Sequence, residues 1–165
     1  ANHMTSDPLP RTPAHKVLIE MAYGDHQVSN VATEVEARTI GAPLRRPTVD
    51  AFRIPDPFVD FFPRLPELGP LMAHGKARPA SHGNGFFVWD IGPKRPDGSG
   101  GVLGTDPAPI TNTAPNDSYG VDPHDTVIDT SAAVRKQIAA FIKPHGRIIP
   151  VCGAHPCYAA GWHGP

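Results

Sequence analysis

The stretch from His15 to Ala42, HKVLIEMAYGDHQVSNVATEVEARTIGA, constrains the fold of this chain more than any other segment. Its apolar run, Val17 to Ala22, is typical of a buried strand. Gly24 and Asp25 break the run, and a segment with helical spacing follows at once. This order predicts a strand, a short loop that carries an acid, and then a helix. Such a unit belongs to an α/β sheet.

The helix after Asp25 has signals at both ends. Ser29 or Asn30 can cap its first turn, and Gly41 suits the position after its last turn. Apolar residues recur at helical spacing and predict a narrow buried face made of Val31, Ala32, Val35, Thr39 and Ile40.

Two later segments are equally regular. Gly85 to Ile91, GFFVWDI, is rich in aromatic and apolar residues and predicts a second strand. Ala132 to Lys143 predicts a last helix, which Thr130 or Ser131 can cap. Its predicted apolar face consists of Val134, Ile138, Phe141 and Ile142.

The rest of the chain is irregular, because it holds most of the 21 prolines and 16 glycines. Residues 1–14 predict a linker or a surface loop, and residues 144–165 predict a C-terminal tail. Residues 43–82 and 92–123 predict two irregular insertions between the regular elements. The first insertion carries aromatic side chains that we expect to pack over the core: Phe52, Phe58, Phe61 and Phe62.

Charge and hydropathy argue against two classes of partner. The chain has 15 basic and 16 acidic residues and no basic stripe, so we expect no binding to nucleic acid. No apolar run reaches the roughly 18 residues that a transmembrane helix needs, so we expect no transmembrane segment.

Asp25 and His124 are the candidate catalytic residues. Asp25 follows the first predicted strand, and His124, in SYGVDPHDTV, lies in a loop before the last predicted helix. A carboxylate can accept the N–H of an imidazole and hold the ring in one tautomer, and the ring can then move protons. In the alternative interpretation, Asp25 only caps a turn or a helix, and His124 only belongs to a solvated loop.

Cys152 and Cys157 lie close together in VCGAHPC. A disulfide between them would close a short loop and would indicate an oxidising compartment, either extracellular or periplasmic. Two reduced thiols are the alternative.

Taken together, these elements resemble the C-terminal part of an α/β-hydrolase. Val17 to Ala22 resembles the penultimate strand of that fold, and Gly85 to Ile91 resembles the last strand. Asp25 resembles the triad acid, with Val28 as the apolar residue that often follows it, and His124 resembles the triad base. The segments GDHQVSN and EVEARTIGAP also resemble exported bacterial hydrolases of this superfamily.

The resemblance implies an α/β fold in which residues 15–143 form the last two strands and flanking helices of a hydrolase-like sheet, with long Pro/Gly-rich loops. It implies an esterase- or lipase-like serine hydrolase acting on a small or lipid-like ester, with no cofactor and no metal. The sequence has no G-x-S-x-G, and Gly98 to Gly101 has the context of a turn. The nucleophile would therefore come from upstream sequence, and the chain is not expected to be active alone. An incomplete sheet would also expose an edge through which the chain could self-associate.

Three alternatives stay open. The gap between Asp25 and His124 exceeds the usual spacing, so His82 and His26 are substitutes for the base. Asp117 to Asp125 could hold calcium, although a plain polar turn is the favoured interpretation of this segment. Finally, the chain could be a small secreted binding or structural domain that is stapled by its two cysteines and has no catalytic activity.

Overall fold

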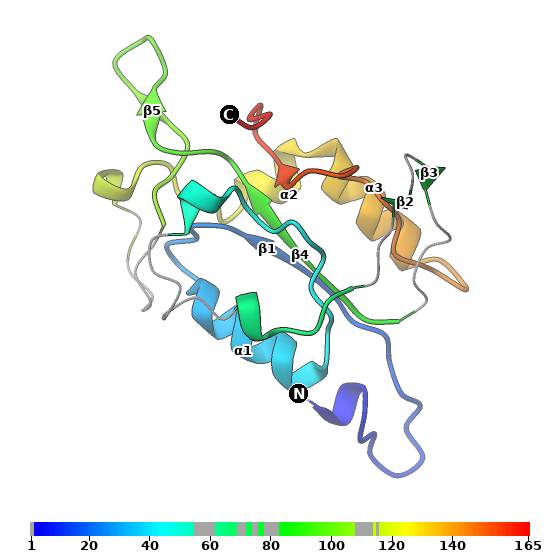
Figure 1. Ribbon diagram of the computed structural model, residues 1–165. Helices are drawn as coiled ribbons and strands as arrows, with labels where there is room; N and C mark the ends of the chain where they lie inside the picture. Colours follow the sequence, from blue (N-terminus) through cyan, green and yellow to red (C-terminus); the bar gives the residue numbers. More distant parts are fainter. Residues whose placement is uncertain are drawn as a thin grey trace.

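A small parallel sheet forms the centre of the molecule (Figure 1). β1 (Leu18–Ala22) pairs with β4 (Gly85–Asp90), and β4 pairs with β7 (Cys157–Tyr158), so the strand order is β1-β4-β7 and every pairing is parallel. The computed structural model describes residues 2–54, 62–68, 72–73, 76–77, 83–107, 114 and 116–165. The described chain is therefore a mixed α/β protein, as the sequence predicts.

Both predicted strands are confirmed, each one residue shorter than predicted. β4 is nevertheless the central strand, not the last one, because β7 joins its other edge. The segment 144–165 is thus more than a tail: it supplies β7 and buries Ile148 and Ala159 in the core. A two-residue strand has no periodicity, so the sequence contains no signal from which β7 could be predicted.

Every residue of β4 is buried, which is typical of a parallel strand that is covered on both faces. Phe86 and Val88 pack in one apolar cluster, whereas Phe87 and Trp89 pack in another, as the alternation of side chains along a strand requires. α1 (Asn30–Ile40) contributes to the first cluster, and α3 (Ala132–Phe141) contributes to the second. The two helices therefore cover opposite faces of the sheet (Figure 1).

α1 begins and ends where the sequence predicts. Ser29 is its N-cap residue, and Gly41 ends it in the left-handed conformation (φ 75°), where the N–H of Ala42 bonds to the carbonyl of Ala37. The predicted buried face is correct for Ile40 but wrong for Val35, which is 42% exposed, and for Ala32 and Thr39, which are exposed. The buried positions are Glu34, Ala37 and Ile40.

The last helix is also confirmed, with an end at Phe141. The Ser131 hydroxyl accepts a hydrogen bond from the N–H of Val134 at 3.3 Å and caps its first turn. Val134 is buried, and Ile138 and Phe141 are partly buried against the same cluster. Ile142 lies beyond the helix end and is 75% exposed, so its predicted burial is wrong.

The irregular regions contain short elements. The first insertion, 43–82, holds η2 (Ala51–Arg53), η3 (Phe62–Arg64) and the antiparallel pair β2 (Met72–Ala73) and β3 (Lys76–Ala77). Phe62 is buried as predicted and Phe52 is 60% exposed, while Phe58 and Phe61 lie outside the described residues.

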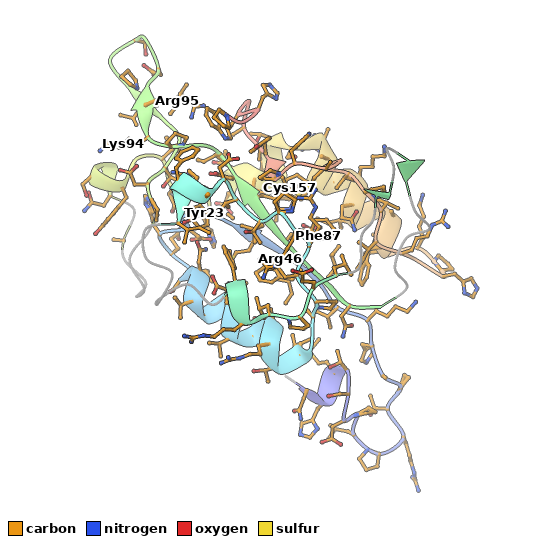
Figure 2. All side chains as sticks on the ribbon, in the orientation of Figure 1. Tyr23, Arg46, Phe87, Lys94, Arg95 and Cys157 are labelled. Carbon is orange, nitrogen blue, oxygen red and sulfur yellow. A yellow bond between two sulfur atoms is a disulfide. The ribbon has the colours of Figure 1, made fainter. Side chains whose placement is uncertain are left out.

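The second insertion, 92–123, forms a hairpin of β5 (Arg95–Pro96) and β6 (Val102–Leu103), followed by η4 (Asp117–Tyr119). Lys94 and Arg95 lie at the base of this hairpin, which projects away from the sheet (Figure 2). The remaining elements are η1 (Asn2–Met4) near the N-terminus and α2 (Thr126–Thr130) just before α3. In the described ranges, no helix has both the length and the apolar character needed to span a bilayer.

Candidate active site

The loop after β1 is short and held from both sides. The Asn30 side chain accepts a hydrogen bond from the N–H of Gly24 and donates one to the carbonyl of Ala22, both at 2.8 Å. Gly24 has φ 83°, and a Cβ there would lie 2.6 Å from the Thr105 Cγ2 atom. Only glycine suits this position, and the chain beyond it delivers Asp25 to the carboxyl end of the sheet.

Asp25 is buried, with 7% of the residue exposed. The two oxygens of its carboxylate have different partners. Oδ1 accepts the backbone N–H groups of Gln27 and Val28, both at 2.8 Å. Oδ2 lies 2.9 Å from Nδ1 of His124. Asp25 therefore caps its own turn, as one alternative held, and also binds the histidine.

The predicted contact between the two candidates is thus confirmed, although they are 99 positions apart in sequence. The His124 side chain is 33% exposed. The hydrogen bond to Asp25 raises the pKa of His124 above its usual value; burial opposes this rise, and the negative charges of Asp25, Asp125 and Asp122 add to it. Among the described residues, no group hydrogen-bonds to Nε2 of His124, which leaves this atom open for proton transfer.

Asp122 joins the two loops. The sequence analysis considered it only within the calcium candidate, Asp117 to Asp125, and missed this role. Its Oδ1 accepts the backbone N–H groups of His26 and His124, each at 3.2 Å, and its Oδ2 accepts the side-chain amide of Gln27 at 2.8 Å. Burial alone would raise the pKa of Asp122, but these hydrogen bonds outweigh it and lower the pKa. The two-residue spacing to His124 is a recognisable turn signal. The bonds to the other loop have no signal in the sequence.

The substitute bases take other places. His26 is 1% exposed, and its Nδ1 accepts the backbone N–H of Asn116 at 3.4 Å. Its Nε2 lies 3.4 Å from the Thr105 hydroxyl, and its ring meets Tyr119 edge to face. His26 is therefore a packing residue beneath the site, while His82 lies outside the described residues.

A buried ion pair between Arg53 and Asp90 lies next to Thr105, the residue against which the loop of Asp25 packs. Two nitrogens of the Arg53 guanidinium bind the two carboxylate oxygens of Asp90, each at 2.9 Å, and both side chains are almost fully buried. Arg53 also donates to the carbonyl of Thr105 at 2.7 Å and lies over the ring of Tyr23. This network fixes the segment against which Gly24 packs, and so it positions the loop of Asp25.

Neither a nucleophile elbow nor a metal site emerges from the described residues. Ser99 lies in the loop of the β5–β6 hairpin, where its hydroxyl donates to the Asp97 carboxylate at 3.0 Å. In the described part of the chain, no group of three or more His, Cys, Asp or Glu side chains could hold a metal ion. In the calcium candidate, Asp122 already accepts three N–H groups, and nothing is described of the Asp117 side chain.

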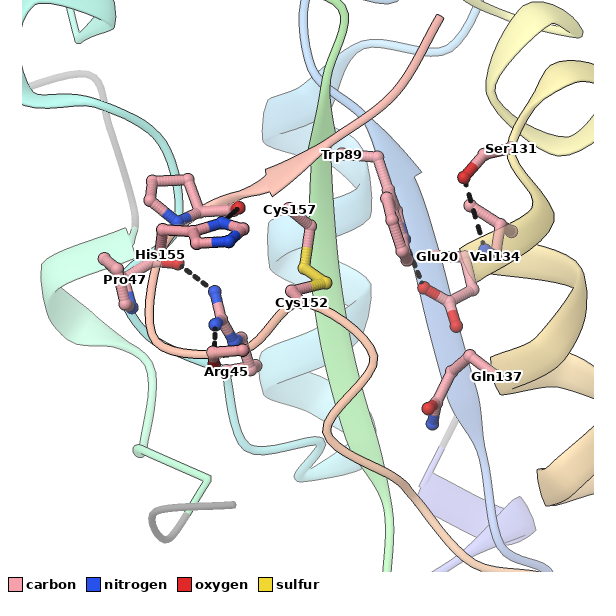
Figure 3. The surroundings of a disulfide bond; sticks show 12 residues. Glu20, Arg45, Pro47, Trp89, Ser131, Val134, Gln137, Cys152, His155 and Cys157 are labelled. Carbon is pink, nitrogen blue, oxygen red and sulfur yellow. Dashed lines mark hydrogen bonds between the residues drawn. A yellow bond between two sulfur atoms is a disulfide. The ribbon is translucent and has the colours of Figure 1, made fainter. Parts of the chain in front are cut away.

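Cys152 and Cys157 form a disulfide, as predicted, with their Cα atoms 5.0 Å apart (Figure 3). Cys157 is the first residue of β7 and pairs with Trp89 of β4. Arg45 binds the carbonyl of Gly153 at 2.9 Å and so holds the disulfide loop against the first insertion. The disulfide therefore closes the loop that leads into β7, which pairs with β4, and takes no part in the Asp25–His124 pair.

Comparison of the chain with protein-family models, with curated proteins and with solved structures found no match.

Proposed function

We propose that Asp25 and His124 are the acid and the base of a serine-hydrolase triad that acts on esters. The observation that carries this proposal is the 2.9 Å contact between Asp25 Oδ2 and His124 Nδ1. The acid follows a parallel strand at the carboxyl edge of the sheet, where α/β proteins place their reactive groups. The chain order, acid before histidine, agrees with the order in the α/β-hydrolase fold.

The hydrogen bonds of Asp25 explain how the pair would work. Two backbone N–H groups on Oδ1 stabilise the carboxylate, and the other oxygen accepts Nδ1–H of His124. The ring is then held in the tautomer whose Nε2 carries a lone pair. Nε2 takes the proton of a serine hydroxyl while the serine oxygen attacks the ester carbonyl. The protonated ring next gives that proton to the leaving alkoxide, and water releases the acyl group by the same two steps.

The nucleophile and the oxyanion donors would come from sequence outside these 165 residues, because no G-x-S-x-G occurs in them. The substrate would be a small or lipid-like ester, since the triad chemistry is that of acyl transfer. The disulfide supports an extracellular or periplasmic location, where thiols oxidise.

The test uses the polypeptide that includes the reading frame upstream of Ala1. We expect a strand followed by G-x-S-x-G in that frame, and hydrolysis of p-nitrophenyl butyrate by the longer polypeptide. Asp25→Asn should lower kcat by about 10⁴-fold and His124→Gln by about 10⁶-fold, because each removes a member of the triad. The acid limb of kcat/KM should lie above the ordinary histidine value of about pH 6.5, since the pKa of His124 is raised and only the neutral ring can act as a base.

Asp129→Asn and His163→Gln are matched controls, because both side chains are exposed and neither is among the groups that shift the pKa of His124. Each should leave kcat within about twofold of the wild-type value. Hydrolysis that survives Asp25→Asn and His124→Gln at the level of these controls would contradict the proposal. A signal peptide directly before Ala1 would favour the alternative, a secreted domain without catalytic activity.

A further inference from the structure

Asp122 contacts both halves of the candidate pair. One of its donors, the N–H of His124, belongs to the base itself. The N–H of His26 belongs to the residue directly after the acid, and the Gln27 side chain belongs to a residue whose own N–H binds Asp25. In the described part of the chain, every hydrogen bond of the Asp122 side chain therefore ends within two residues of Asp25 or on His124.

These bonds join segments that are far apart in sequence. Asp122 is separated by 96 positions from His26 and by 95 from Gln27. Without them, the hydrogen bonds that join the Asp25–Gln27 turn to the segment 122–124 in the described part of the chain reduce to the single Asp25–His124 bond. One bond fixes a distance but leaves the ring free to rotate and tilt, whereas the two further bonds to His26 and Gln27 fix the relative placement of the two loops.

We propose that Asp122 is a positioning residue, which holds the loop of Asp25 and the loop of His124 at the separation that their hydrogen bond requires. Its catalytic meaning rests on the proposed function, but the positioning itself does not. The charged groups that face His124 are Asp25, Asp122 and Asp125, so the effect of Asp122 through its charge must be separated from its effect through Asp25.

The experiment measures the pKa and the tautomer of His124 in the intact 165-residue chain by ¹⁵N NMR titration of its ring. Asp25→Asn should lower the pKa of His124 and mix its tautomers. Asp122→Ala should reproduce most of this fall and the same mixing, because the two loops lose their common acceptor. Asp122→Asn should restore most of the wild-type behaviour, since it keeps Oδ1 as an acceptor for both backbone N–H groups.

Asp125→Asn is the matched control for charge, because Asp125 is exposed and contributes only its charge to His124. It should lower the pKa of His124 slightly and leave the tautomer unchanged. A double variant tests whether Asp122 acts on His124 through Asp25. In the Asp25→Asn background, adding Asp122→Ala should lower the pKa of His124 by no more than Asp125→Asn does. A fall from Asp122→Ala that matches Asp125→Asn in the wild-type background, with the tautomer preserved, would overturn the proposal.

A second measurement checks folding. The circular dichroism spectrum of Asp122→Ala must match that of the wild type before the pKa values of His124 are compared. If Asp122→Ala does not fold, Gln27→Ala, which removes only the bond to Oδ2, should still lower the pKa of His124 and a null result there would overturn the proposal. The NMR readout needs no nucleophile, so its failure is distinct from a failure of the longer polypeptide to hydrolyse esters.

Discussion

At the scale of single residues, Glu20 is an acid in the middle of β1 that faces the apolar core. Burial raises the pKa of Glu20 to about 8, although its hydrogen bond from the Trp89 indole lowers the pKa in part. Its Oε2 accepts that indole N–H at 2.5 Å, while Oε1 and the nearby Gln137 amide nitrogen have no hydrogen-bond partner among the described residues (Figure 3). Glu20 is therefore mostly protonated at neutral pH.

Replacing Glu20 by Gln should stabilise the protein increasingly as the pH rises. In the unfolded chain the acid ionises near its ordinary value of 4.5, whereas in the folded chain it ionises near 8. The folded state thus binds more protons between these values, and wild-type stability falls as the pH rises through this window. Glu20→Gln removes this loss, so its free energy of unfolding should exceed that of the wild type by about 1–3 kcal/mol at pH 8.

Urea denaturation at pH 5 and pH 8 measures the difference. Glu36→Gln, at an exposed position of α1, is the matched control and should show no such trend. A stability difference for Glu20→Gln that is the same at both pH values would mean that Glu20 is solvated and ionised in the folded protein.

The residue scale also shows what could be predicted of the site. Asp25 and His124 were identified because each lies in a loop next to a regular element, and such positions leave signals in the sequence. Asp122 was missed because two of its three hydrogen bonds reach the other loop. Acceptors of this kind are visible only after the chain has folded.

At the scale of the elements, the N-terminus of α3 depends on a side chain that caps it. Ser131→Ala should reduce the free energy of unfolding by about 1 kcal/mol, because the N–H of Val134 loses the hydroxyl that accepts it. Asp125, at the N-cap of α2, makes no such bond, so Asp125→Ala should change stability by less than about 0.5 kcal/mol. Chemical denaturation compares the two, and equal losses would refute the assignment of the cap.

The face of α1 shows why helix bounds are easier to predict than helix orientation. Caps are local, and both ends of α1 lie where Ser29 and Gly41 indicate. Orientation depends on the sheet against which the helix packs. In the structure, Glu34 is buried and Val35 is exposed, which the apolar pattern does not predict. The position of the helix over β1 and β4 determines which side is buried.

At the scale of the whole molecule, the disulfide closes the loop through which the C-terminal segment enters β7 and the core. Loss of the bridge should cost about 2 kcal/mol, because the loop that it closes is short. For a chain of this size, that corresponds to a fall in Tm of about 4–8 °C.

Calorimetry of the double variant Cys152→Ala, Cys157→Ala measures this fall, and a reducing agent should have the same effect on the wild type but none on the variant. The His124 titration should be unchanged in the variant, since the bridge lies apart from the pair. Equal melting of the oxidised and reduced wild type would show that β7 stays docked without its bridge.

The sequence by itself determined the elements that rest on local interactions: the two longer strands, the residues at which both main helices begin, and the loops that hold Asp25 and His124. Short-range periodicity and turn chemistry carry that information. The tertiary structure decided the rest: the place of β4 as the central strand, the side of α1 that is buried, and the convergence of Asp25, His124 and Asp122. These features depend on contacts between residues remote in sequence, which exist only once the parallel strands have brought their carboxyl ends together.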